Sequence, residues 1–332
     1  MPDGHERLSL SAMNDRQFRA LARPYIVTDG SRFRLKSFDP KGPGPHETQH
    51  NAKRFLKKSI KSLSALQERL YAQDRWGVLL IFQAMDAAGK DSAIKHVMSG
   101  IDPKGCQVYS FKAPSDEELD HDFMWRTSKA LPERGRIGIF NRSYYEEVLV
   151  VRVHPEFLTR QKLPPELVTK KIWKERYEDI NAFERYLSRN GYVIRKFFLN
   201  VSRDEQRRRF LERLTLDEKN WKFSMADAKE REYWDDYMSA YDDMIRHTAT
   251  EEAPWVVVPA DNKAFARVVV GAAVISALES IGLAFPKVDA AKKRELDAAR
   301  DVLESEKGAG RDTGRKAGHK KQESERREGA RR

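Results

Sequence analysis

The sequence predicts an α/β fold in which helices flank a mostly parallel sheet. Segments with strand character alternate with segments of helical periodicity, an order that is typical of parallel sheets. A small-residue loop joins a buried strand to a helix in LLIFQAMDAAGKDSAIKHV, residues 79–97. The chain has 332 residues, 40% of them hydrophobic, which is enough for one large core.

Five runs rich in β-branched and aromatic residues read as strands. They are WGVLLIF at 76–82, CQVYSF at 106–111, RIGIF at 136–140, YVIRKFFLNV at 192–201 and PWVVVPAD at 254–261. Apolar residues at helical spacing, with start and stop signals, predict the helices between them. These helices cover residues 48–74, 90–99, 116–131, 164–191 and 263–281, and one more opens with Ser202 and Glu205 as a capping box.

The chain ends differ in composition from the centre. Prolines and glycines in FDPKGPGPHETQH predict that residues 1–48 form an extended arm. Residues 49–286 form the predicted folded domain, and residues 287–332 a charged tail that we expect to be disordered. From residue 290 onward there are 14 Lys or Arg against 9 Asp or Glu, within a net charge of +11. That charge suggests a polyanionic partner, although a basic tail alone is also typical of a plain solvated extension.

Composition excludes several classes of protein. The single cysteine, Cys106, cannot form an internal disulfide and indicates a reducing, cytoplasmic setting. The first residues lack the apolar segment of a secretory signal, and no run of 18 apolar residues occurs, so we expect no membrane span.

The loop after the first core strand predicts a phosphate site. Backbone N–H groups and the positive end of the following helix converge there, Gly89 allows close approach, and Lys90 adds a point charge. Ala84 stands where the usual pattern has glycine, which requires a negative φ at that residue. The alternative is an ordinary strand-to-helix turn with a surface lysine.

Two aspartates make this loop unusual. A carboxylate beside phosphate is favourable only with a cation between them, so Asp86 is predicted to bind Mg²⁺, directly or through water. Asp91 replaces the hydroxyl residue of the usual pattern, and it also suits the first turn of a helix, where the dipole favours an acid.

The end of the strand at 136–140 supplies a second set of polar residues. Asn141 can ligate a metal through its amide oxygen, and Arg142 can bind phosphate oxygens in a bidentate manner. Glu146 and Glu147 orient metal or acceptor in one interpretation and are surface residues in the other. Further along, Arg207, Arg208, Arg209 and Arg213 belong either to a lid at about 202–232 that closes over phosphates or to a solvated charged helix.

Six blocks between residues 50 and 285 resemble the family-2 polyphosphate kinases. They are FQAMDAAGKDSAIKHVMSGIDPKGCQV, LDHDFMWR, FNRSYYEEVLVVRVHPE, SRDEQRRRFLERL, NWKFS and EAPWVVVPADNK. The resemblance implies a P-loop kinase fold with a helical lid. It also implies transfer of phosphate between inorganic polyphosphate and nucleotides that depends on Mg²⁺, for which Mn²⁺ can substitute.

The resemblance also implies roles for single residues. Catalytic roles fall on Asp86, Lys90, Asn141, Arg142, Arg208 and Arg209, with Asp86 and Asn141 at the metal. Substrate contacts fall on Ala87, Ala88, Gly89, Asp91, Ser92, Lys104, Arg126 and Glu146. Asn141 departs from the family, in which many members have Asp. The FNRS block followed by tyrosine and glutamate resembles the subgroup that phosphorylates AMP and ADP, and the family suggests a homo-tetramer or dimer.

Two other functions use the same features. An ATP-dependent nucleoside monophosphate kinase would need the same loop and lid arginines, and the donor distinguishes it. A polyanion- or nucleic-acid-binding protein would use the basic tail, but no zinc spacing, aromatic-plus-basic RNA signature or glycine-clamp loop is present, so we expect no specific nucleic acid.

Overall fold

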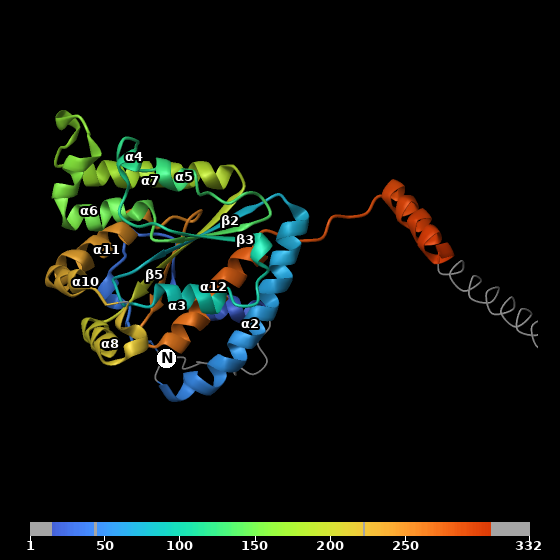
Figure 1. Cartoon of the computed structure of the whole chain (residues 1–332), viewed down its shortest axis with the longest axis horizontal. Coiled ribbons are helices and arrows are strands. Elements are labelled where there is room, and N and C mark those ends of the chain that lie inside the picture. The colour runs from blue at the N-terminus through green and yellow to red at the C-terminus, as the bar shows by residue number, and fades with distance from the viewer. Residues whose placement is uncertain (1–14, 43–44, 222, 307–332) are drawn as a thin grey trace, which may run out of the picture. The chain divides into compact units, whose positions relative to one another are not determined.

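The chain folds around a six-stranded sheet with helices on both faces (Figure 1). The computed structural model describes residues 15–42, 45–221 and 223–306 and divides into two units, residues 1–284 and 285–332. The sheet lies in the first unit and has the strand order β1-β6-β5-β2-β4-β3. All neighbouring strands are parallel except β1 and β6, which confirms the predicted α/β fold.

All five predicted strands are present. They are β2 (Gly77–Gln83), β3 (Cys106–Ser110), β4 (Ile137–Asn141), β5 (Tyr192–Asn200) and β6 (Trp255–Pro259). Every residue of β2 is buried, because the strand lies in the middle of the sheet with helices on both sides. This position explains why its apolar run does not alternate with polar residues.

The two faces of the sheet carry different helices (Figure 1). On one face α1 (Asp15–Ala22), α2 (Pro45–Gln73), α3 (Lys90–Val97) and α12 (Lys263–Glu279) lie together, with α12 against β5 and β6. On the other face α6 (Val150–Val153), α7 (Ile172–Arg189) and α11 (Trp234–Thr248) pack on one another, with α7 against β5. The predicted helices at 48–74, 90–99 and 263–281 correspond to α2, α3 and α12.

The predicted N-terminal arm contains structure that the sequence pattern did not reveal. Besides α1 it holds η2 (Arg23–Tyr25), β1 (Ile26–Val27) and η3 (Leu35–Ser37). The side chains of Phe18 and Ala22 are fully buried, and β1 adds an antiparallel edge to β6. These elements are too short to show a hydrophobic period, so extension was the wrong prediction for residues 15–42. Residues 1–14 and 43–44 lie outside the described residues.

Two predicted helices are shorter than the sequence suggested. The segment 116–131 forms only α4 (Asp116–Leu119) and α5 (Trp125–Ser128), since the Asp122 carboxylate accepts a bond from the Met124 N–H and starts a new turn. The segment 164–191 forms η7 (Pro165–Leu167) and then α7. Its two prolines lack N–H groups, and the Thr169 hydroxyl accepts from the Lys171 N–H just before α7 begins.

The region predicted as a lid consists of short helices after β5. They are α8 (Arg203–Thr215), α9 (Asp217–Asn220), α10 (Met225–Lys229) and η8 (Glu230–Tyr233). The Ser202 hydroxyl caps α8 by accepting from the Glu205 N–H at 3.2 Å, as predicted. The reciprocal half of the capping box is replaced, because the Ser202 N–H donates to the Asp261 carboxylate at 2.8 Å.

The second unit contains a helix over residues 290–306 in which every side chain is exposed. We predicted disorder for this segment because it has few apolar residues, but Ala, Leu, Glu, Lys and Arg are good helix formers. The rest of the predicted tail, residues 307–332, lies outside the described residues. Among the helices that are described, none has the length and apolar character needed to cross a bilayer.

Candidate active site

The loop between β2 and α3 has the backbone that a phosphate cradle requires. Ala84 does not have a positive φ, so alanine fits where the usual pattern has glycine. Gly89 has φ 105°, a conformation that favours glycine, and α3 begins immediately after it. Ala87 has φ 60°, which is strained for a residue with a Cβ. The loop is therefore held in one defined shape at the start of a helix.

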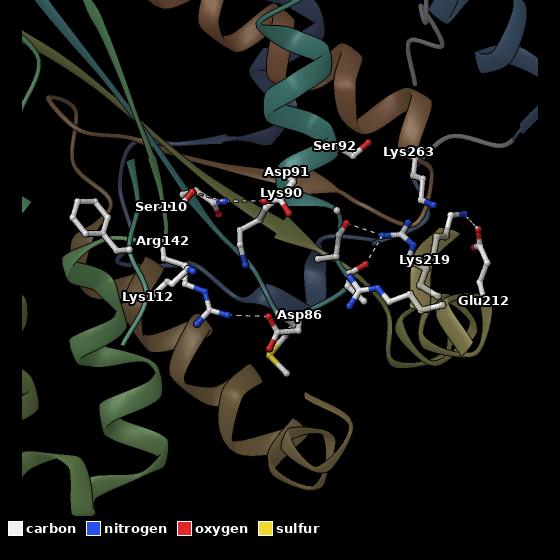
Figure 2. A pocket seen from close by; sticks show the side chains of 18 of the residues that line it. Asp86, Lys90, Asp91, Ser92, Ser110, Lys112, Arg142, Glu212, Lys219 and Lys263 are labelled. Carbon is white, nitrogen blue, oxygen red and sulfur yellow. Dashed lines mark hydrogen bonds and ion pairs between the residues drawn. The ribbon is translucent and has the colours of Figure 1, made fainter. Parts of the chain in front are cut away.

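Lys90 projects into the space enclosed by this loop (Figure 2). Its ammonium donates to the Ala84 carbonyl at 3.0 Å. Desolvation lowers the pKa of Lys90, and the nearby charge of Arg142 lowers it further, against the opposite effect of Asp86. An anion bound in the loop would raise the pKa of Lys90 again by stabilising the charged ammonium, so the site favours phosphate beside Lys90.

The carboxyl ends of three neighbouring strands meet beside the loop. Asn141 ends β4 and pairs in register with Phe82 of β2 and Ser110 of β3. The Asn141 amide nitrogen donates to the Asp91 carboxylate at 2.7 Å. The amide oxygen is buried and has no hydrogen-bond partner among the described residues. A buried acceptor without a donor is a place where a ligand or metal can bind.

Arg142 connects the loop to the segment after β4. Its guanidinium donates to the Asp86 carboxylate at 2.9 Å and contacts Glu146 at 3.4 Å. Glu146 and, to a lesser degree, Asp86 raise the pKa of Arg142, which keeps its charge fixed. The residue has φ 65°, a strained backbone of the kind that clusters at functional sites.

Arg209 supports the loop from α8. Its buried guanidinium donates to the carbonyl oxygens of Ala87, Ala88, Ala260 and Asp261 and pairs with a carboxylate on its own helix. These bonds tie the loop to the end of β6. The sequence left open whether this arginine folds over phosphate or lies on a solvated helix, whereas here the side chain is buried and bonded to the loop backbone.

Arg208, its neighbour in sequence, has the opposite environment. Its side chain is 60% exposed, pairs with Glu205 and Glu212 on the same helix, and does not line the cavity described below. For Arg208 the structure matches the alternative of a solvated charged helix. Two adjacent arginines of one motif therefore differ in burial and in partners.

This contrast leads to a stability prediction. Arg209→Met should lower the free energy of unfolding by about 2–4 kcal/mol, because four carbonyl oxygens lose this donor, three of them in buried hydrogen bonds. The matched variant Arg208→Met should change it by less than about 0.5 kcal/mol, since exposed ion pairs contribute little. Urea denaturation of both variants measures the difference. Equal losses would contradict the supporting role of Arg209.

A cavity of about 700 Å³ opens above the loop. It is lined by the loop residues 85–89, by the first turn of α3 and by the ends of β3 and β4. The positively charged lining residues are Lys90, Lys112, Arg142, Arg209, Arg213, Lys219, Lys263 and Arg267. Figure 2 shows Lys112 and Arg142 on one side of Lys90 and Lys219 and Lys263 on the other, so the cations extend in both directions from the loop.

Several of these cations were not predicted from the sequence. Lys112 follows β3, and Lys263 opens the helix after β6. Arg267 lies one turn further along that helix and donates to Ser92 at 2.9 Å. The rule that ligands bind beyond the carboxyl ends of parallel strands would have indicated Lys112 and Lys263. Lys219 lies in α9, away from any strand end, so this rule would not have indicated it.

The remaining predicted residues fall into different places. Lys104 lies in η4 (Pro103–Gly105) and lines neither this cavity nor the next. Arg126 and Glu146 line a second cavity of about 200 Å³ that shares Phe111, Lys112, Ala113 and Arg142 with the first.

Glu147 also lines the second cavity, and it is fixed by Arg176 at 2.6 Å and by Gln161. Neither Glu146 nor Glu147 is a free surface residue, which was one of the two interpretations. Glu146 instead contacts Arg142, and Glu147 is held in place by its partners.

The residues fit a magnesium ion that is shared with substrate. No group of three or more His, Cys, Asp or Glu side chains placed to hold a metal occurs in the described part of the chain. Mg²⁺, however, commonly uses only one or two protein oxygens and completes its shell with water and phosphate oxygens. The carboxylate of Asp86 and the unpartnered amide oxygen of Asn141 are two oxygens that could ligate such an ion.

A phosphate-binding loop beneath a cation-lined cavity, at the carboxyl edge of a parallel sheet, defines a P-loop phosphotransferase. The model of the family described as Polyphosphate kinase 2 (PPK2) matches residues 46–284, and the chain belongs to this family. The resemblance seen in the sequence is thereby confirmed.

Named relatives and a solved structure agree with this assignment. A protein of Rhodopseudomonas palustris named ADP-polyphosphate phosphotransferase is 50% identical over 85% of this chain and 98% of its own length. One of Meiothermus ruber named AMP/ADP-polyphosphate phosphotransferase is 41% identical over 82% of this chain and 98% of its own. The crystal structure of Polyphosphate Kinase 2 from Arthrobacter aurescens covers 84% of this chain and 96% of its own, with a TM-score of 0.75 and 40% identity.

Proposed function

We propose that this chain transfers phosphate from inorganic polyphosphate to AMP and ADP, forming ADP and ATP. The main support for the proposal is the charge of the main cavity, whose described lining residues include eight Lys or Arg and three Asp or Glu. The excess suits a long polyanion held beside a phosphate-binding loop. The names of the relatives support the same donor, and they support ADP and AMP as acceptors.

The lining of the main cavity favours an inorganic donor over a nucleoside triphosphate. Among the lining residues that the structure describes, only Phe111 contributes an aromatic ring, on the side that the second cavity shares. The opposite side, toward Lys219 and Lys263, offers charges and, among the described residues, no ring on which a base could stack. A chain of phosphates needs only the charges.

The second cavity suits the nucleotide acceptor. Phe111, Phe123 and Phe157 give it aromatic and apolar walls, and Arg126 and Arg160 are among its charged lining residues. A base and ribose need such a surface, with a few polar groups for orientation. Because the two cavities share Lys112 and Arg142, an acceptor phosphate here would face the donor phosphate over the loop.

In this arrangement the chain stabilises charge and positions both substrates. Lys90 neutralises the phosphate held in the loop, and Arg142 binds oxygens at the junction of the two cavities. Asp86 and Asn141 would hold Mg²⁺, or Mn²⁺ in its place, and the ion would neutralise further phosphate charge when bound. Phosphoryl transfer needs little more than this positioning and neutralisation.

Phosphorus NMR tests the proposal directly. Purified protein is incubated with AMP, Mg²⁺ and long-chain polyphosphate, and in parallel with AMP, Mg²⁺ and ATP. We expect the β-phosphate of ADP and then the γ-phosphate of ATP to appear with polyphosphate as the donor. If AMP were phosphorylated in the incubation with ATP and not in the one with polyphosphate, the protein would be a nucleoside monophosphate kinase.

Asn141 is proposed to favour AMP as an acceptor. AMP carries one phosphate and needs less metal neutralisation than ADP, so an amide in place of a carboxylate suits it. Asn141→Asp would also place a second carboxylate beside Asp91, whose oxygen lies 2.7 Å from the amide nitrogen. We expect the ratio of AMP to ADP activity to fall in this variant. An unchanged ratio in initial-rate assays would show that Asn141 does not select the acceptor.

Deleting residues 290–332 tests the role of the basic tail. We expect the truncated protein to keep its transfer activity on short polyphosphate, because every residue of both cavities lies before residue 268. A loss of binding to long polyphosphate with intact catalysis would make the tail an accessory anchor. The homo-oligomeric assembly and the cytoplasmic location expected from the sequence stay predictions, which sedimentation and cell fractionation can check.

A further inference from the structure

A buried polar network lies behind the active-site segment that carries Arg142. Glu184 of α7 accepts hydrogen bonds from the hydroxyls of Tyr144 and Tyr145, both at 2.8 Å on the same carboxylate oxygen. Its other oxygen contacts the ammonium of Lys196 in β5 at 2.6 Å. All four side chains are at most 2% exposed. Tyr144 also lines the second cavity, whereas Tyr145, Glu184 and Lys196 line neither cavity.

The network is closed at its other end as well. The ammonium of Lys196 also donates to the Tyr145 hydroxyl at 2.9 Å and to the Thr248 carbonyl at 2.7 Å. The Tyr145 ring packs edge-on against Trp255 of β6. Helix α7, two strands and the end of α11 are thus joined to one pair of tyrosines.

These tyrosines lie two and three residues after Arg142. They begin η5 (Tyr144–Val148), which also carries Glu146, one of the partners of the Arg142 guanidinium. On the other side, the Arg142 N–H donates to the Phe82 carbonyl of β2 at 3.0 Å. Arg142 therefore has its strained φ of 65° between two fixed points, the sheet before it and the anchored tyrosines after it.

Stability alone does not explain such a network. Burial lowers the pKa of Lys196, against the opposite effect of Glu184. A buried Lys–Glu pair is often no more stabilising than apolar side chains of the same volume. The network instead fixes the orientation of the two tyrosine side chains, because each hydroxyl donates to the same carboxylate oxygen.

We propose that Glu184, Lys196 and Tyr145 are positioning residues that act through Arg142. They hold the η5 segment so that the guanidinium stays at the junction of the two cavities, aimed at the transferred phosphate. The expected effect on the transfer rate rests on the proposed function. The expected displacement of Arg142 rests only on the backbone geometry at that residue. The hydroxyl of Tyr145, which lines neither cavity, would then control the rate of transfer.

A double-mutant cycle tests the kinetic consequence. Tyr145→Phe keeps the ring and removes the hydroxyl; we expect kcat with polyphosphate to fall roughly tenfold while KM for polyphosphate changes less than about twofold. In an Arg142→Met background the same substitution should have no further effect on kcat. The matched control is Tyr177→Phe, which removes another buried hydroxyl, one that accepts from Arg152 at 2.7 Å. Tyr177→Phe should lower Tm about as much as Tyr145→Phe does, and it should leave kcat unchanged.

Crystal structures of the wild type and of Glu184→Gln give a readout that does not depend on activity. We expect Arg142 to leave the φ > 0 region or to lose its 2.9 Å contact with Asp86 in the variant. An unmoved Arg142, or a Tyr145→Phe effect of equal size in both backgrounds, would overturn the proposal. A wild-type protein inactive with polyphosphate would refute the proposed function instead, and displacement of Arg142 would still support the positioning role.

Discussion

Lys90→Ala is expected to lower kcat by about 10²–10³-fold, because the loop loses the one ammonium at its centre. No other lysine of the loop or of α3 can replace it, since Lys95 is exposed and does not line the cavity. The substitution should leave Tm equal or raise it. Desolvation and Arg142 both lower the pKa of Lys90, so its charge is poorly accommodated when phosphate is absent.

Steady-state assays with polyphosphate and ADP, together with thermal unfolding, measure both effects. Lys95→Ala on the same helix is the matched control and should keep wild-type kcat. If Lys90→Ala retained more than about a tenth of wild-type turnover, the loop would not be the site where charge develops. A large drop in Tm would assign Lys90 a structural role instead.

The loop could be predicted from the sequence because its physics is local. A buried strand, small residues and a helix start occupy neighbouring positions in the sequence. They can be recognised without knowledge of the rest of the fold. Even the requirement of a negative φ at Ala84 could be stated in advance, and the structure meets it. The same holds for Asn141 and Arg142, which follow directly from the end of a recognisable strand.

The roles of the lid arginines could not be predicted in this way. Arg208 and Arg209 are adjacent and chemically identical, and only the packing of α8 against the loop makes one buried and the other exposed. The ion pair of Glu184 and Lys196, 12 residues apart in the chain, depends in the same way on the packing of α7 against β5. The burial and the partners of these side chains are determined by the direction in which each one points in the folded protein, and residue type alone does not indicate that direction.

Asp86 is expected to have the second large effect, and its two roles can be separated. Its carboxylate pairs with Arg142 at 2.9 Å and is also a predicted ligand of Mg²⁺. Asp86→Asn keeps the size of the side chain and removes the charge. If the carboxylate holds the ion, kcat should fall about 10²-fold and the Mg²⁺ concentration for half-maximal rate should rise about tenfold or more.

Glu146→Gln provides the matched control, because Glu146 is the other carboxylate in contact with Arg142, at 3.4 Å. Substitution of either acid removes one ion pair of Arg142, but only the loss of a metal ligand should shift the Mg²⁺ titration. We therefore expect Glu146→Gln to lower kcat while its Mg²⁺ titration matches that of the wild type. A normal Mg²⁺ titration in Asp86→Asn would leave Asp86 as a partner of Arg142 alone and would remove the metal from this side of the loop.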